Sequence, residues 1–278
     1  MADLFSQIQY YLGFTFVQRA LFAGILISLC AALLGVSLVL KRYSMIGDGL
    51  SHVGFGALSA AAVLNLGAPI WLALPVVMIS AFFLLRLTEN SKINSDAAIA
   101  VISSSALAIG VFIASLNGTN INLQQYMFGS ILAVEQSDII ISIILAVVVI
   151  AMYVLFYNKI FAITFDEGFA KATGMNTRLY NIFVSLLTAV TIVVGMKMLG
   201  TLLISAMIIF PALTSMRICK RFLSVILTSV GVSVFSVVSG LCLSFQTDTP
   251  VGATIVIINL IIFLVFLLIS IIKKKLRK

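Results

Sequence analysis

The stretch Leu21–Leu40 reads LFAGILISLCAALLGVSLVL and contains no charged residue. A helix needs about 20 predominantly apolar residues to cross the hydrocarbon core of a bilayer, so this stretch is long enough to span one. The pair Lys41-Arg42 ends it. Of all 278 residues, 62% are hydrophobic and only 9% are charged, whereas a soluble domain carries about 25% charged residues. We therefore predict an integral membrane protein.

Further apolar stretches predict an all-α polytopic transmembrane bundle of about eight to nine helices. They cover approximately residues 47–64, 70–85, 97–116, 139–156, 182–195, 199–215, 222–245 and 253–272. The number depends on Met196-Lys197, where two stretches form either two helices or one broken helix. Residues 126–134 are apolar but too short for a span, so a re-entrant or interfacial position suits them. We expect a single domain over residues 1–278, with residues 1–20 as an uncleaved segment at the membrane surface.

The basic residues predict the orientation of this bundle. If Lys41-Arg42 lies in the cytoplasm, fifteen of the 17 lysines and arginines fall on that side, and only Arg19 and Lys197 do not. Short cytoplasmic loops carry such an excess of Lys and Arg. We therefore expect a multi-pass protein of the cell membrane with an external N-terminus and a cytoplasmic C-terminus. Topology also explains the net charge of +8 better than nucleic-acid binding does.

The stretch Ile46–Gly54 reads IGDGLSHVG and contains His52, the only histidine in the chain. On a helix, Asp48 and His52 are four residues apart and share a face. Because ionisable residues within an apolar segment are costly, the pair is a candidate functional site. Carboxylate plus imidazole is a common ligand set for Zn, Mn or Fe(II). A structural Asp–His hydrogen bond and a proton relay are the alternatives.

Two small residues, Gly56 and Ser59, continue the stripe of Asp48 and His52 along the same predicted helix. Small side chains there either leave space beneath the pair, as part of a pathway, or let another helix approach closely. The residues alone leave both interpretations open.

Two further positions could contribute to a pathway through the membrane. Lys197 is a lone basic residue between apolar stretches, which suits either a snorkelling side chain at a helix end or a break in a helix that lines the pathway. Asp248 lies in the turn Gln246–Gly252, where it is a turn former or cap, or else an extra cation contact near the pore mouth.

A polar interval covers residues 158–181 and predicts a short capped helix. Acidic Asp166 and Glu167 stand at its front, Lys171 falls in its last turn, and Gly174 follows it. The orientation argument places this helix in the cytoplasm. The three cysteines, Cys30, Cys219 and Cys242, lack metal-type spacing and are interpreted as packing residues.

Several of these stretches resemble the zinc, manganese and iron class of ABC-transporter permeases. Lys41–His52 is similar to the motif R-x-S-L-x-G-D-A-x-S-H of that class. Asp166, Ala170 and Gly174 match its coupling segment, D-x-x-x-A-x-x-x-G. The stretches Tyr126–Ser130, Gly200–Pro211 and Asp248–Gly252 also resemble motifs of the class. The resemblance covers nearly the whole chain, in order.

The resemblance implies a homodimeric permease that imports a divalent transition metal. In such proteins, the residues matching Asp48 and His52 coordinate the passing ion, which is cargo and not a resident cofactor. It also implies a separate cytoplasmic ATPase and an extracytoplasmic metal-binding protein. The helix around 166–174 would dock on the ATPase, with Phe165 and Phe169 as buried contacts beside Glu167 and Ala170.

The residues that follow His52 in the sequence provide a clue to which metal is transported. Many manganese-type members have Ala-Val-Leu-Pro-Gly there, whereas this chain has Val53-Gly54-Phe55-Gly56, without proline. This departure resembles zinc-type members, so zinc is favoured, and manganese and iron remain alternatives.

Two rival functions come from other classes of protein. In a proton-coupled secondary transporter, Asp48 and His52 would act as the relay. A membrane-embedded metal hydrolase is disfavoured because a single histidine leaves too few ligands and acid–base groups. The chain has no G-x-x-x-x-G-K-[ST] stretch, so it carries no nucleotide site of its own. The resemblance implies a transport subunit and not an enzyme, with ATP hydrolysis in a separate subunit.

Overall fold

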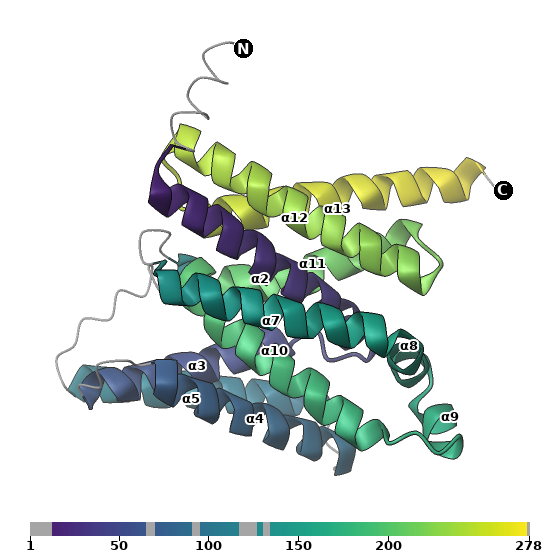
Figure 1. Cartoon of the computed structure of the whole chain (residues 1–278), viewed down its shortest axis with the longest axis horizontal. Helices are drawn as coiled ribbons and strands as arrows, with labels where there is room; N and C mark the ends of the chain where they lie inside the picture. The colour runs from purple at the N-terminus through teal and green to yellow at the C-terminus, as the bar shows by residue number, and fades with distance from the viewer. Residues whose placement is uncertain (1–12, 65–69, 91–94, 117–126, 130–133, 277–278) are drawn as a thin grey trace.

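The computed structural model describes residues 13–64, 70–90, 95–116, 127–129 and 134–276, and the elements in this part of the chain are all helices (Figure 1). They are α2 (Thr15–Leu40), α3 (Ile46–Val63), α4 (Ile70–Asn90), α5 (Ser95–Leu116), α7 (Gln136–Leu155), α8 (Tyr157–Phe165), α9 (Glu167–Ala172), α10 (Thr177–Leu199), α11 (Thr201–Ile218), α12 (Phe222–Thr247) and α13 (Val251–Leu276). The predicted all-α polytopic bundle is confirmed.

Seven of the described helices are long and apolar enough to cross a membrane, by length and composition. They are α2, α5, α7, α10, α11, α12 and α13. The other two stretches predicted to span form α3 and α4, which pack within the same bundle. Helix α3 is less apolar because it carries Asp48, His52 and several glycines. The predicted number of eight to nine is therefore close to what is observed.

The ends of the bundle differ in charge. The C-terminal ends of α2 and α13, the short helices α8 and α9, and the α11–α12 connection lie together on the right in Figure 1. Lys41, Lys159, Lys171, Arg221 and Lys273 belong to these segments, and we call this side the basic end. The α10–α11 junction and the α12–α13 turn lie at the opposite end. The grouping agrees with the charge pattern, and its cytoplasmic placement stays a prediction.

Helix α2 runs through the middle of the packing and contacts α7, α10, α11 and α12. A Cβ added at Gly35 would collide with the carbonyl oxygen of Ile208, so α2 and α11 pack backbone against backbone. Small residues at helix contacts allow this approach in membranes, where packing rather than hydrophobicity drives association. Large exposed side chains such as Phe112, Val154 and Leu268 lie on outer helices. Such side chains suit contact with lipid.

The junction between α10 and α11 lies at Gly200, three residues beyond Lys197. Gly200 has φ +89°, a conformation that side-chain-bearing residues rarely adopt. The two apolar stretches on either side of Met196-Lys197 are thus separate helices, and Lys197 belongs to the last turn of α10.

Two expectations fall largely outside the described residues. Of the segment 1–20, residues 1–12 are not described, and Thr15 already begins α2. Of the apolar stretch 126–134, only residues 127–129 and Val134 are described. Whether either segment is interfacial or re-entrant stays a prediction.

Candidate metal site

The candidate pair lies near the start of α3, just after the tight connection from α2. His52 Nε2 is 3.6 Å from Asp48 Oδ1. Hydrogen bonds of this kind are about 2.7–3.2 Å long, so the two groups are close neighbours without a firm hydrogen bond. The side chains of His52 and Asp48 are 25% and 37% exposed. The pair therefore shares one face of the helix, as predicted, and remains accessible.

The other ring nitrogen, Nδ1 of His52, is buried and has no hydrogen-bond partner among the described residues. Leaving a buried polar atom unsatisfied costs about 1–3 kcal/mol, and such atoms often mark functional sites. A purely structural Asp–His pair would instead use its polar atoms in firm hydrogen bonds. The geometry thus favours a ligand role or a relay role over a structural one.

The glycines of α3 bring three helices against its other faces. A Cβ at Gly49 would lie 2.5 Å from Ile99 Cγ2 of α5, and one at Gly54 would collide with Met196 of α10. A Cβ at Gly47 would lie 3.0 Å from Ile208 Cδ1 of α11. Helix α3 is consequently held on several sides while the Asp48 and His52 edge stays partly open.

Gly56 and Ser59 do not both provide open space below the pair. A Cβ at Gly56 would lie 2.8 Å from the carbonyl oxygen of Ala106, so Gly56 lets α5 approach α3. Ser59 is buried, and its Oγ has no hydrogen-bond partner in the part of the chain that is described. Gly56 thus fits the second of its two interpretations, the close approach of a neighbouring helix.

Lys197 binds a carboxylate that sequence reasoning did not single out. Its Nζ lies 2.8 Å from Oδ1 and 3.1 Å from Oδ2 of Asp138 in α7, and 3.8 Å from Glu135 Oε2. Asp138 is only 2% exposed and also accepts a hydrogen bond from the backbone N–H of Glu135. The spacing Glu135-x-x-Asp138 before an apolar stretch is a capping pattern, which could have drawn attention to Asp138.

This ion pair borders a cavity of about 360 Å³ at the end of the bundle opposite the basic end. Trp71, Leu58 and Met196 line the same cavity. Lys197 is not a free charge, because its ammonium group is neutralised by a buried carboxylate. Its place in the last turn of α10 agrees with the helix-end interpretation, and a role in the pathway stays a prediction.

Asp248 forms the turn between α12 and α13. It adopts the left-handed conformation, with φ +49°, and its side chain is exposed. Asp tolerates this conformation better than most residues. The turn-former interpretation therefore accounts for Asp248 without a cation.

The segment 158–181 contains the predicted short capped helix, α9. Asp166 is its N-cap, and Asp166 Oδ1 accepts a hydrogen bond of 2.9 Å from the Phe169 N–H. Gly174 follows with φ +81°, and Ala170 is buried. Phe169 is 60% exposed. The helix thus presents an aromatic side chain outward while Ala170 packs inward.

The other predicted aromatic contact, Phe165, is held against neighbouring rings. Its ring centroid lies 4.8 Å from that of Phe161 and 5.8 Å from that of Phe222. Phe165 is nevertheless 58% exposed, similar to Phe169. Glu167 differs from both, because its carboxylate forms ion pairs with Lys41 and Lys171 of the same chain.

Comparison with known proteins identifies the class. Residues 13–270 match the model of the ABC 3 transport family. The match covers most of the chain, so the chain belongs to this family, and the resemblance to metal ABC permeases is confirmed. The chain is a multi-pass membrane protein of that class.

Particular relatives carry different metals in their names. The chain is 31% identical over 252 residues to the manganese import system permease protein ScaB of Streptococcus gordonii, covering 91% of this chain and 90% of that protein. It is 29% identical over 255 residues to the high-affinity zinc uptake system membrane protein ZnuB of Haemophilus influenzae, covering 91% and 97%. Identity to these relatives is similar and does not distinguish the metal.

A solved structure shares the fold. The chain superposes on PsaBC from Streptococcus pneumoniae, determined in complex with Fab, with a TM-score of 0.82 and 29% sequence identity. The superposition covers 95% of this chain and 94% of the other.

Proposed function

We propose that the chain is the permease subunit of an ATP-binding-cassette importer that moves a divalent transition metal, with zinc favoured, into the cytoplasm. Asp48 and His52 bind the passing ion. The observation that carries the proposal is the loose, partly exposed Asp48–His52 pair, with an unpartnered ring nitrogen, in a chain of the ABC 3 transport family.

The pair suits a transported ion better than a stored one. Transport requires binding that is strong enough to admit the ion and weak enough to release it. The described residues hold no group of three or more His, Cys, Asp or Glu side chains that could bind a metal together. The described part of one chain thus offers two side-chain ligands, and water, backbone carbonyl groups or a second copy supply the rest. The partly open face of α3 is compatible with a homodimer.

Zinc is favoured by the Val53–Gly56 stretch, which lacks the proline of many manganese-type proteins. Imidazole ligation suits iron as well as zinc and does not choose between them. The names of the relatives support the class of metal but are divided among manganese, zinc and iron. Manganese and iron are therefore the alternatives within this class. Competition among Zn²⁺, Mn²⁺ and Fe²⁺ for uptake decides between them.

The two ends of the bundle indicate where each partner protein binds. Phe169 projects from α9 at the basic end, where a cytoplasmic ATPase docks. An extracytoplasmic metal-binding protein delivers the ion at the opposite end. The basic end faces the cytoplasm because the positive-inside rule places it there, and the C-terminus of α13 lies at that end.

The test is zinc uptake by proteoliposomes that contain the permease with or without its ATPase. The proposal expects uptake only when the ATPase and ATP are both present. Uptake driven by a proton gradient without any ATPase would contradict the proposal and favour the secondary transporter, with Asp48 and His52 as its relay.

A further inference from the structure

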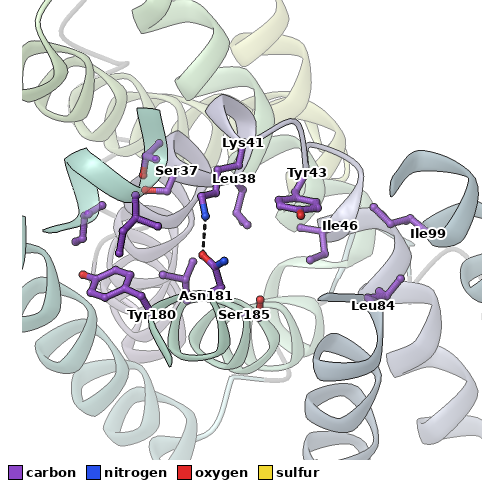
Figure 2. A pocket seen from close by; sticks show the side chains of 14 residues that line it. Ser37, Leu38, Lys41, Tyr43, Ile46, Leu84, Ile99, Tyr180, Asn181 and Ser185 are labelled. Atoms are coloured by element: carbon purple, nitrogen blue, oxygen red, sulfur yellow. Dashed lines mark hydrogen bonds between the residues drawn. The ribbon is translucent and has the colours of Figure 1, made fainter. Parts of the chain in front are cut away.

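Helix α9 is tied to the body of the bundle by one carboxylate. Glu167 Oε2 lies 3.2 Å from Lys41 Nζ, at the end of α2. Glu167 Oε1 accepts a hydrogen bond of 3.3 Å from Asn181 Nδ2 of α10. Lys41 Nζ in turn donates a hydrogen bond of 2.5 Å to Asn181 Oδ1, drawn as the dashed line in Figure 2. Three separate segments of the chain meet in this triangle.

The triangle is not an ordinary surface ion pair. The Lys41 side chain is 14% exposed, and Asn181 is buried. Hydrogen bonds that involve a charged group are stronger than neutral ones. Removing one partner leaves the polar groups of the other two partly buried without a hydrogen bond to offset their lost hydration. The geometry of α9 relative to α2 and α10 is therefore fixed more firmly than exposed lysine–glutamate pairs would fix it.

Glu167 is ionised at neutral pH. Partial burial alone would raise the pKa of its carboxyl, but the hydrogen bond from Lys171 and the charge of Lys41 outweigh burial and hold the pKa below its ordinary value. A carboxyl whose pKa is depressed by folding stabilises the folded state above its unfolded pKa and loses that effect as the pH falls through the folded value. The triangle is thus intact throughout the neutral range.

Lys41 connects this triangle to the candidate metal site along the chain. Only residues 42–45 separate it from Ile46, where α3 begins, and Asp48 lies in the first turn of α3. The connection is a tight turn, since Arg42 has φ +65° and the Tyr43 N–H donates a 2.8 Å hydrogen bond to the carbonyl of Leu38. Because the connection is short and hydrogen-bonded, a displacement of Lys41 is expected to move the start of α3 as well.

A small pocket of about 30 Å³ lies beside Lys41 and Asn181. Lys41, Tyr43, Ile46 and Asn181 line it together with apolar side chains from α4 and α5, including Leu84 and Ile99 (Figure 2). Ile46 at the start of α3 and two side chains of the triangle, Lys41 and Asn181, therefore face the same space.

We propose that Glu167, Lys41 and Asn181 form a positioning link that transmits movement of α9 to α3, and so couples the docked ATPase to the Asp48–His52 site. The inference rests on the proposed function, since it requires an ATPase at α9. None of the three residues touches the metal, and each acts through the helix that it holds.

The test compares metal uptake with ATP hydrolysis in the purified permease–ATPase complex in proteoliposomes. Lys41→Met is expected to retain the ATPase and its basal ATP hydrolysis but to transport at least about fivefold less zinc per ATP. Lys41→Arg, which keeps the charge, is expected to recover most of the ratio. Lys159→Met is the matched control, because Lys159 also lies at the basic end but contacts the Phe156 ring.

Exchanging the charges of Glu167 and Lys41 provides a second test that does not depend on Lys41→Met. Glu167→Lys and Lys41→Glu are each expected to lower zinc transported per ATP, and the double exchange is expected to restore part of it. A purely structural role would change the melting temperature without changing the ratio. An unchanged ratio in Lys41→Met and in both single exchanges would overturn the link, whereas absence of ATP-dependent uptake in the unaltered complex would overturn the proposed function itself.

Discussion

Two of the pairs of ionisable side chains in the described helices differ in how closely their members contact each other. Asp138 and Lys197 join α7 to α10 through contacts of 2.8 and 3.1 Å, with the carboxylate almost fully buried. Asp48 and His52 lie on one helix, 3.6 Å apart, and both side chains are partly exposed. The Asp138–Lys197 pair has shorter contacts, a more buried carboxylate and more hydrogen bonds than the Asp48–His52 pair.

The difference is the one expected between a pair that joins two helices and a pair that binds a ligand. Both oxygens of Asp138 are used by Lys197, and one of them also accepts the Glu135 N–H, so the carboxylate has little capacity for a further ligand. In the other pair, Nδ1 of His52 has no described partner and the Asp48 carboxylate is the more exposed of the two side chains. We call Asp48–His52 the open pair, because partly exposed ligand atoms can accept an ion. We call Asp138–Lys197 the closed pair, because its ion pair joins α7 to α10.

The largest expected effect is on uptake through the open pair. His52→Ala removes the only imidazole of the chain, and we expect zinc uptake to fall by at least about tenfold, because even outer-shell changes at metal sites cost 10–100-fold. Uptake of radioactive zinc by cells measures this, with immunoblots of the membrane fraction to show that the variant is present. Normal uptake in His52→Ala would remove the distinction between the two pairs.

Breaking the closed pair is expected to affect stability first. Asp138→Ala leaves the Lys197 ammonium without its buried partner, which costs about 3–5 kcal/mol in comparable cases. We expect a clear fall in the melting temperature of the purified protein, measured in nanodiscs. An unchanged melting temperature would show that this pair does not hold α7 and α10 together.

Replacing both members of the closed pair sharpens the comparison. The double variant Asp138→Leu with Lys197→Met puts apolar side chains where two charges were, and such replacements are often neutral or stabilising. We expect a melting temperature near that of the original protein and uptake that is largely retained. Loss of uptake in a stable double variant would assign Lys197 or Asp138 to the pathway after all.

A modest effect is expected at Gly56, which lies on the same stripe of α3 as Asp48 and His52 but packs against α5. Gly56→Ala would put a Cβ 2.8 Å from the Ala106 carbonyl oxygen, so α3 and α5 must separate slightly, at a cost of about 1–3 kcal/mol. We expect a lower melting temperature and modestly lower uptake.

Gly231→Ala in α12 is the matched control for Gly56→Ala. A Cβ at Gly231 would have no neighbour within 4 Å, so no loss of stability is expected there. Equal melting temperatures for Gly56→Ala and Gly231→Ala would contradict the close packing of α3 on α5.

Local patterns predicted the open pair and the capped helix because their parts are neighbours in sequence. Asp48 and His52 are one helical turn apart, and Asp166 caps α9 through a residue three positions later. The apolar stretches likewise predicted the bundle, since each helix carries its own pattern. At Gly56, the residues left two interpretations open, because a small side chain suits both a cavity and a close helix contact.

The closed pair could not be predicted in the same way. Lys197 meets Asp138 across 59 residues, and Lys41 meets Glu167 across 126, so neither contact follows any helical period. A lone lysine in an apolar stretch indicates that a partner or an interface is needed, but not which carboxylate supplies it. The helix break at Gly200 instead of Lys197 depends on a backbone conformation that glycine permits, which hydropathy does not record.

The most direct test of the central claim is equilibrium zinc binding to the purified protein in nanodiscs, comparing Asp48→Asn with Lys197→Met. The account predicts that Asp48→Asn, which keeps the size of the side chain but removes its charge, weakens zinc binding, whereas Lys197→Met leaves zinc binding at the Asp48–His52 site in place. Undiminished zinc binding by Asp48→Asn would contradict the account.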